Sequence, residues 1–479
     1  MCFGNLLWDV DGQPAAELGP AQAAASHFSQ SPRGAIGLKR LPAVVVRLQQ
    51  SEAVSFLAFS ITASEPLHLT HHLRKDGPLK PSINPEGRKS VLHQRQHIKM
   101  AESAHAYVRG NTVRFYEWLR SDLVKATLPS GPDIWICGDC HTGNLGPVSN
   151  VDGEIDIQIR DLDQTVIGNP AHDLLRLGLS LAMAARSSDL PGVTTALMLE
   201  EVIVGYLAGL NGRSARAEPD EIEPIRRVMR DAKTRRWRHL AEERIEDVSP
   251  KIPLGRKFWA LAKEERQELQ EFFDESNSEK LIQCIHGSGK KGHVRMLDAA
   301  YWMKGCSSLG RLRYAVLISV GKKKEHQYRL LDIKEATHAA APCTKESDMP
   351  LNNAERVVTG ARNLSPYLGE RMLPATFAGR QVVVRELRPQ DLKFDLVGLR
   401  QPEAIAIARL MAGVVGRGHG RQMERESRRS WAKELKGRHG KGLDAPRWLW
   451  SGVLELAALH EAAYLEHCRR YAMDVRKNS

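Results

Sequence analysis

The sequence predicts an α+β fold with two lobes: a mostly antiparallel lobe formed by residues 295–390 and a larger, mainly helical lobe assembled from both flanks. Long apolar, proline-free stretches before residue 295 are typical of buried helices. Strand-like runs bounded by glycine and charged turns gather between residues 295 and 390. The expected helices include residues 174–185, 194–210, 404–415 and 448–473, and the expected strands include residues 312–320, 327–334 and 380–387.

The bulk composition limits the class of protein. A chain of 479 residues is too long for one small core, and its 42% hydrophobic content is that of an ordinary globular protein. The net charge of +12 suits polyanionic partners such as nucleotides or nucleic acid. Seven scattered cysteines do not form a disulfide framework, so we expect a cytoplasmic protein. The apolar run at 53–63 is too short to span a bilayer, and we expect no membrane span.

The chain divides into four expected segments. Residues 1–83 are rich in Ala, Gly, Ser and Pro and predict a poorly ordered arm. Residues 84–294 predict the helical lobe, residues 295–390 the strand lobe, and residues 391–479 the helices that complete the helical lobe. A basic run at 226–238 predicts a solvated helix face. Nucleic-acid contact is its weaker alternative, since only one aromatic residue, Trp237, interleaves with the charges.

The chemistry concentrates in residues 133–174. One short apolar run leads into Asp139, and a second run, alternating apolar and polar at 155–159, leads into Asp161. The amide of Asn144 lies five residues after the first carboxylate. Carboxylate and amide oxygens are suitable ligands for Mg²⁺ on a phosphate tail. This stretch therefore predicts a phosphoryl-transfer site, and two unrelated acidic strand ends are the alternative.

The segment Cys-Gly-Asp-Cys-His-Thr-Gly-Asn at 137–144 resembles the catalytic loop of the kinase-like superfamily, in its aminoglycoside-phosphotransferase branch. That branch shows His-Gly-Asp-x-His-x-x-Asn. The resemblance implies that Asp139 orients the acceptor hydroxyl, Asn144 binds a metal and His141 braces the loop. Cys137 replaces the usual first histidine. The Cys137 and Cys140 pair also permits a zinc or redox interpretation, which lacks a second pair at ligand spacing.

A second segment agrees with the first in spacing. Asp161 precedes Gly-Asn-Pro-Ala-His-Asp-Leu at 168–174, which resembles the Gly-Asp-Pro-Ala-x-Asp-Leu element of phosphotransferases. The resemblance implies that Asp161 is the main Mg²⁺ ligand, that Asp163 is a further candidate, and that Asp173 is a buried aspartate bonded to the catalytic-loop backbone. Only eleven residues separate Asp161 from Asp173, too few for a protein kinase's activation segment, which favours a small-molecule acceptor.

The parts of a nucleotide-binding lobe follow the catalytic loop in the chain. Gly305 and Gly310 flank a turn that resembles a phosphate-covering loop, with Ser307 where a middle glycine is usual. Lys334 lies on a strand that resembles the one bearing the phosphate-gripping lysine, and Glu355 on the next helix is its expected partner.

The strand at 380–387 resembles the one leading to the hinge, where backbone near Glu386 and Leu387 would meet adenine. Residues 404–421 resemble the helix that normally precedes the catalytic loop. This order is a circular permutation, which is admissible where the joined ends lie at the surface. Together with the motif Met-x-x-Ser-x-x-x-Tyr-x-Arg-Gly at residues 100–110, this arrangement resembles an uncharacterised bacterial family, domain of unknown function 2252, within the kinase-like superfamily. Arg109 is a candidate anion contact for the acceptor.

The resemblance implies ATP- and Mg²⁺-dependent transfer of the γ-phosphoryl group to a hydroxyl of an unidentified acceptor, more in keeping with a small molecule than a protein. Two alternatives stay open. The same fold can transfer AMP to a protein, or the chain can be a non-catalytic pseudokinase that binds nucleotide or nucleic acid.

Overall fold

The computed structural model describes thirteen parts of the chain, all of them in the second of two compact units, Leu67–Ser479. The described residues are 85–212, 222–236, 240, 251–255, 257–274, 280–281, 285, 293–306, 308–321, 327–345, 348–394, 398–437 and 445–477. The expected arm at 1–83 lies outside them, as does Ser307.

The described chain is a mixed α/β protein with antiparallel sheets. Its longer helices are α2 (Pro85–Ala101), α6 (Ala171–Ser187), α7 (Gly192–Leu210), α8 (Glu223–Thr234), α10 (Lys263–Asp274), α12 (Asn353–Leu364), α14 (Gln401–Gly420), α15 (Arg425–Gly437) and α16 (Arg447–Lys477). The short helices are α3 (Ala104–Gly110), α4 (Thr112–Leu119), α5 (Asp122–Thr127), η2 (Thr142–Asn144) and α13 (Pro366–Gly369). The strands are β1 (Ile134–Ile136), β2 (Leu145–Ser149), β3 (Ile155–Ile159), β4 (Val166–Gly168), β5 (Phe258–Trp259), β6 (His293–Trp302), β7 (Arg313–Gly321), β8 (Gln327–Glu335), β9 (Met372–Phe377) and β10 (Arg380–Leu387).

A six-stranded antiparallel sheet has the order β5-β6-β7-β8-β10-β9. Its strands β7, β8 and β10 confirm the strands predicted at 312–320, 327–334 and 380–387. β8 lies between β7 and β10, which places Lys334 opposite Arg313 on one side and Val383 on the other. The sheet also takes in Phe258 and Trp259, although the charged pattern of residues 256–275 predicts a helix there. Their rings stack on Trp302 and Tyr301 of β6, so burial of aromatic surface overrides the charged pattern that begins at residue 256.

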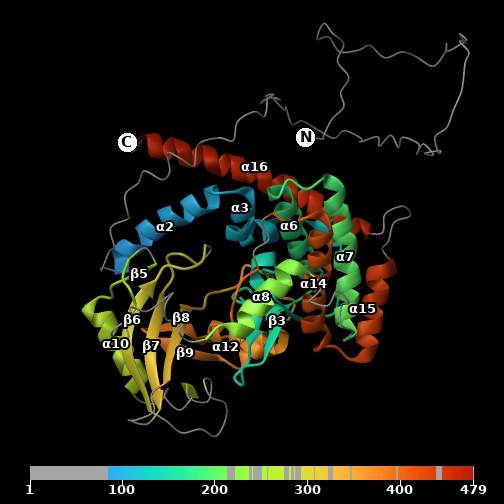
Figure 1. The fold of residues 1–479 in the computed structure, drawn as a ribbon. Coiled ribbons are helices and arrows are strands. Elements are labelled where there is room, and N and C mark those ends of the chain that lie inside the picture. The colour runs from blue at the N-terminus through green and yellow to red at the C-terminus, as the bar shows by residue number, and fades with distance from the viewer. Residues whose placement is uncertain are drawn as a thin grey trace, which may run out of the picture. The chain divides into compact units, whose positions relative to one another are not determined.

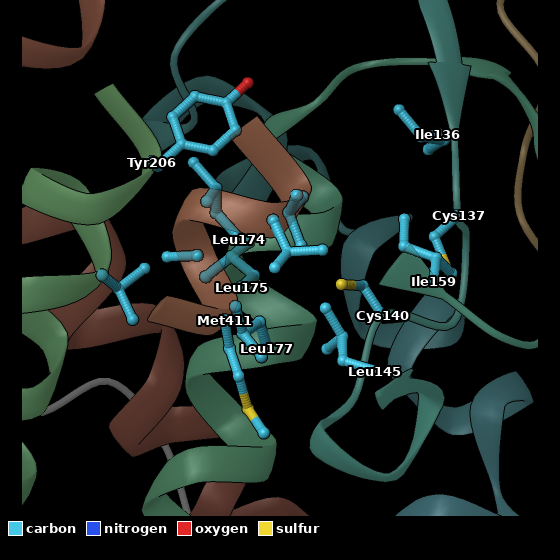
Figure 2. Close-up of a cluster of buried hydrophobic side chains, with 14 of the residues drawn as sticks. Ile136, Cys137, Cys140, Leu145, Ile159, Leu174, Leu175, Leu177, Tyr206 and Met411 are labelled. Atoms are coloured by element: carbon cyan, nitrogen blue, oxygen red, sulfur yellow. The ribbon is translucent and has the colours of Figure 1, made fainter. Parts of the chain in front are cut away.

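Two small sheets carry the loops predicted to hold the chemistry. β1 pairs with β4, and β2 pairs with β3, so that both apolar runs of the 133–174 stretch form strands as expected. Figure 2 shows Ile136, Cys137 and Ile159 from these strands and the adjoining loop, near Leu174 and Leu175 of α6. The loop that contains Asp139 therefore lies on a buried apolar base.

The helices pack around α6, α7 and α14. Of the described helices, only α7 is long and apolar enough to cross a bilayer, and 56% of its apolar window is buried within the protein, as in a core helix. α7 and α14 approach so closely that a Cβ on Gly209 would lie 2.1 Å from the Gly413 carbonyl oxygen. The C-terminal helix α16 runs beside α2 and α3 (Figure 1), and the Tyr464 hydroxyl of α16 donates to the Ala101 carbonyl of α2.

The contact between α7 and α14 gives the first testable prediction. Gly209→Ala should lower the free energy of unfolding by about 3 kcal/mol, because the added methyl group meets backbone atoms that have no rotamer to change. Gly192→Ala is the matched control, since a Cβ there meets no atom within 4 Å. Urea unfolding of both variants measures the difference. Equal stabilities would show that the two helices separate at little cost.

Candidate functional site

A cleft of about 380 Å³ opens between the loop after β1, the face of the large sheet formed by β7, β8 and β10, and helices α2, α3 and α12. Among the predicted site residues, it brings together Arg109, Asp139, His141, Asn144, Asp161, Asp163, Gly305 and Lys334. These side chains come from positions more than 200 residues apart in the sequence. The predicted catalytic, metal and phosphate-gripping residues therefore share one cavity.

The loop that carries Asp139 is braced by its own polar groups. The Asn144 side-chain nitrogen donates to the Asp139 carbonyl oxygen at 2.9 Å, and the Asn144 backbone N–H donates to the His141 carbonyl at 2.8 Å. The Gly143 N–H donates to Nδ1 of His141 at 3.1 Å. Burial and the charges of Arg109 and Arg176 hold the pKa of His141 well below its usual range, so the imidazole is neutral and can accept this bond. His141 is thus tied to the loop through both its side chain and its carbonyl group.

Asp139 itself is held by a residue that sequence reasoning missed. Nε of Arg176 donates to Oδ1 of Asp139 at 2.8 Å, and Nη2 of the same guanidinium donates to the Val108 carbonyl at 2.7 Å. Burial raises the pKa of Asp139, whereas the charge and hydrogen bond of Arg176 oppose that rise. A signal was present in the sequence, because Arg176 interrupts an otherwise apolar helix, three residues after Asp173.

Asp173 makes the backbone contacts that the resemblance implied. Its two carboxylate oxygens accept from the N–H groups of Cys137 at 2.7 Å and Gly138 at 2.9 Å. Gly138 has φ +74°, and a Cβ there would lie 2.1 Å from the Gln164 carbonyl oxygen, so the turn requires glycine. Nε2 of His419 from α14 lies 3.1 Å from the Asp173 carboxylate. The completely buried Asp173 carboxylate thus has partners on both oxygens.

The two cysteines of the loop form part of the core. Sulfur and oxygen donors of Cys137, Cys140 and Asp173 lie within 4.8 Å of one another, a spacing that could hold a metal. The Asp173 oxygens are already engaged by N–H donors. The hydrogen bond that the Cys137 thiol donates to Cys140, together with burial, raises the pKa of Cys137 well above its usual range. Because zinc binds the thiolate, this arrangement favours a packed pair of thiols, as Figure 2 shows them among apolar side chains.

Lys334 meets the predicted metal ligands across the cleft. Its Nζ lies 3.7 Å from Oδ1 of Asp161 and forms an ion pair with Oδ2 of Asp163. Burial favours the neutral form of Asp161, but the charges of Lys334, Arg313 and Arg385 outweigh it and lower the pKa of this carboxyl. Burial and the neighbouring Asp161 charge raise the pKa of Asp163. Asp161 is therefore the more strongly ionised of the two carboxyls.

Glu355 does not meet Lys334. It is exposed in the first turn of α12, whereas Ala354, Val357 and Val358 of the same helix are buried. The apolar face sets the rotation of the helix and turns Glu355 to solvent. The buried Arg356 instead meets the loop that follows β3: its guanidinium donates to the carbonyl oxygens of Asp163 and Thr165.

The predicted adenine hinge does not line the cleft. Glu386 faces the other side of the sheet, where its carboxylate pairs with Arg329 and Arg388 at 3.0 and 2.9 Å. Leu387 packs instead with Leu317 and Leu330, outside the cleft. The Glu386 carbonyl accepts from Nη1 of Arg371 at 2.9 Å. Residues Val383 and Arg385 of the same strand face the cleft instead. Successive side chains of a strand point to opposite faces of the sheet, and in β10 the odd-numbered positions point toward the side of the cleft. The sequence did not reveal which of the two sets would do so.

Only one end of the turn between Gly305 and Gly310 lines the cleft. Gly305 lines the cleft with φ +92°, and its carbonyl accepts from Nζ of Lys99 at 2.8 Å. Gly310 also has positive φ, at +90°, but does not line the cleft, and Ser307 lies outside the described residues. The neighbouring Lys304, Cys306 and Ser308 complete this edge.

The sequence model of a family described as "Uncharacterized protein conserved in bacteria (DUF2252)" matches residues 88–470. The matched range includes all the cleft residues described above. No curated protein and no solved structure matches the chain.

The position of Asp173 gives a second prediction. Asp173→Asn should lower the free energy of unfolding by about 1–3 kcal/mol, because one N–H donor of the loop would face an amide NH₂ in a site closed to water. Asp122→Asn is the control, since that side chain is 97% exposed, and its effect should stay within about 0.5 kcal/mol. Urea unfolding compares the two. An unchanged midpoint for Asp173→Asn would contradict the structural role assigned to this carboxylate.

Proposed function

The chain belongs to the family of uncharacterised bacterial proteins that matches residues 88–470, and from this premise and its cleft we propose that it is a phosphotransferase that uses ATP and Mg²⁺. In this proposal the fold is kinase-like and circularly permuted, with residues 133–174 preceding the strand that bears Lys334. The γ-phosphoryl group is transferred to a hydroxyl of a small-molecule acceptor.

The observation that carries the proposal is the convergence of Lys334 with Asp161 and Asp163 in the cleft that also contains Asp139. Packing alone gives no reason to gather these charged groups in a cavity, since charged residues are costly to bury. The contacts of Asp173 with the loop backbone support the same assignment, because they hold Asp139 and Asn144 on one rigid turn.

The side chains present fit a metal ion bound to a nucleotide. Asp161 and Asp163 would supply carboxylate oxygens. The nitrogen of the Asn144 amide is used within the loop, so its oxygen would be the ligand atom. Lys334, Arg313 and Arg385 would face the phosphates from the sheet. When bound, Mg²⁺ would neutralise charge on the phosphates.

Asp139 would act on the acceptor. In the proposed step the acceptor hydroxyl gives its proton to the Asp139 carboxylate while its oxygen forms a bond to the γ-phosphorus, and the bond from that phosphorus to the bridging oxygen of ADP breaks. Arg176 fixes the carboxylate by its bond at 2.8 Å, so that the free oxygen is presented to the hydroxyl. Positioning and charge neutralisation supply most of the catalysis in such reactions.

Binding of Mg-ATP tests the proposal directly. Wild-type protein should bind Mg-ATP, and Asp161→Asn and Lys334→Met should each weaken that binding at least about tenfold, because each removes one charge from the pair that would meet the metal and the phosphates. Lys345→Met is the control, since Lys345 pairs with Asp133 at 3.7 Å and does not line the cleft. Isothermal titration calorimetry gives the dissociation constants.

Transfer is then followed with ATP labelled at the α or the γ position. Retention of the γ label in product supports phosphotransfer, and retention of the α label supports AMP transfer instead. Absence of Mg-ATP binding by the wild type would refute both, and binding without transfer to any acceptor would point to a pseudokinase.

A further inference from the structure

The cleft carries more positive charge than its own carboxylates balance. Eight lysine and arginine side chains line it, against five aspartate and glutamate side chains. Cations brought together in a partly desolvated cavity repel one another, so an excess of this kind destabilises the folded protein unless a ligand offsets it. The distribution of partners among these cations shows where the excess lies.

Most of the cations already have partners. On the sheet, Lys334 pairs with Asp161 and Asp163, and Nε of Arg313 donates to Asp332 at 2.8 Å. Arg385 donates to the Arg160 carbonyl at 3.0 Å, and Arg160 in turn donates to the Asp391 carbonyl at 2.8 Å. At the glycine edge, Lys99 donates to the Gly305 carbonyl, and Lys304 lies 4.2 Å from the centre of the Trp302 ring.

Two cations differ from the rest. Within the described parts of the chain, neither Arg109 nor Lys393 forms an ion pair or a hydrogen bond, and Nε of Arg109 is buried without a partner. An unpaired buried guanidinium nitrogen normally costs about 1–3 kcal/mol, which makes this one a candidate for a ligand contact.

Both cations line the cleft, and Arg109 belongs to its Asp139 end. Arg109 lies against the catalytic loop, where a Cβ on Gly143 would be 2.7 Å from its Nη2. The absence of a side chain at Gly143 leaves the guanidinium its place beside the loop. Lys393 lines the same cleft, and burial together with the charges of Arg109 and Arg160 lowers the pKa of its ammonium group to about 8.

We infer that Arg109 and Lys393 bind an anionic group of the acceptor, a phosphate or a carboxylate, while the acceptor's hydroxyl lies at Asp139. The inference rests on the proposed function and narrows its substrate class to hydroxyl compounds that carry a negative charge. A guanidinium can bind either oxyanion through two parallel hydrogen bonds, and an ammonium adds a point charge beside it. In the proposed function the phosphates of the nucleotide would meet the cations of the sheet, Lys334 and Arg313, so the two anions would bind to different cations of the cleft.

The probes for the test are glycerol 3-phosphate and glycerate, with glycerol as the neutral counterpart. Each is titrated into the full-length protein saturated with Mg²⁺ and a non-hydrolysable ATP analogue, so that the nucleotide end is filled. The wild type should bind one or both anions at least tenfold more tightly than glycerol. The anion that binds with the higher affinity shows whether the site prefers a phosphate or a carboxylate.

Arg109→Gln and Lys393→Gln should each weaken anion binding at least tenfold and change the affinity for the ATP analogue less than twofold. Arg109→Lys keeps the charge but loses the paired hydrogen bonds, so it should lie between wild type and Arg109→Gln, and it serves if the glutamine variant does not fold. Lys345→Gln, outside the cleft, should match the wild type.

Two results would overturn the inference: equal binding of glycerol and the anions, or a loss of ATP-analogue affinity in Arg109→Gln as large as the loss for the anion. The second would assign these cations to the nucleotide. The same titrations without nucleotide separate this inference from the proposed function. If the wild type binds no ATP analogue but still binds the anions through Arg109, the anion site stands and the phosphotransferase proposal falls.

Discussion

The buried carboxylate of Asp173 is the interaction on which the geometry of the cleft depends. It accepts two backbone N–H groups of the loop that carries Asp139, and it meets His419 of α14. Nδ1 of His419 lies 3.0 Å from the Tyr206 hydroxyl, which also accepts from Trp431 of α15 at 2.9 Å. A chain of polar contacts thus runs through the apolar core, where each bond is strengthened by the low dielectric. These contacts tie the backbone of the loop to helices from the last third of the sequence.

Helix α6 controls both the backbone and the side chain of the loop. Asp173 in its first turn fixes the loop backbone, and Arg176 one turn later fixes the Asp139 carboxylate. The same Arg176 donates to the Val108 carbonyl, next to Arg109 in α3. The proposed base and the proposed anion contact are therefore positioned by a single helix. A shift of α6 would change both together, which makes its tight packing in the core a requirement of the site.

Alternation along the chain was sufficient to predict strands β7, β8 and β10 of the sheet, because a strand's pattern depends on residues close in sequence. The contacts of Asp173 with the loop backbone join residues more than 30 positions apart, and only the family resemblance implied them. The exposed position of Glu355, which we expected to meet Lys334, follows from the pattern of its own helix. Ala354, Val357 and Val358 define the buried side of α12 and leave Glu355 outside it. The partners of Glu386 could not be predicted in this way. Arg329 and Arg388 neutralise its buried carboxylate, and the first of them comes from a different strand.

The large sheet brings charges together in a way that secondary structure does not require. Register places Arg313 directly opposite Lys334, a like-charge pair that weakens a sheet. Asp332 lies opposite Arg385 and bonds to Arg313, so it offsets part of the repulsion. Two apolar residues at the same positions would pack without any such compensation. That these strands carry an alternating set of charges into a cavity, with Asp161 and Asp163 supplied from another part of the chain, argues that the sheet face is adapted to a highly charged anion. The phosphates of a nucleotide meet that requirement.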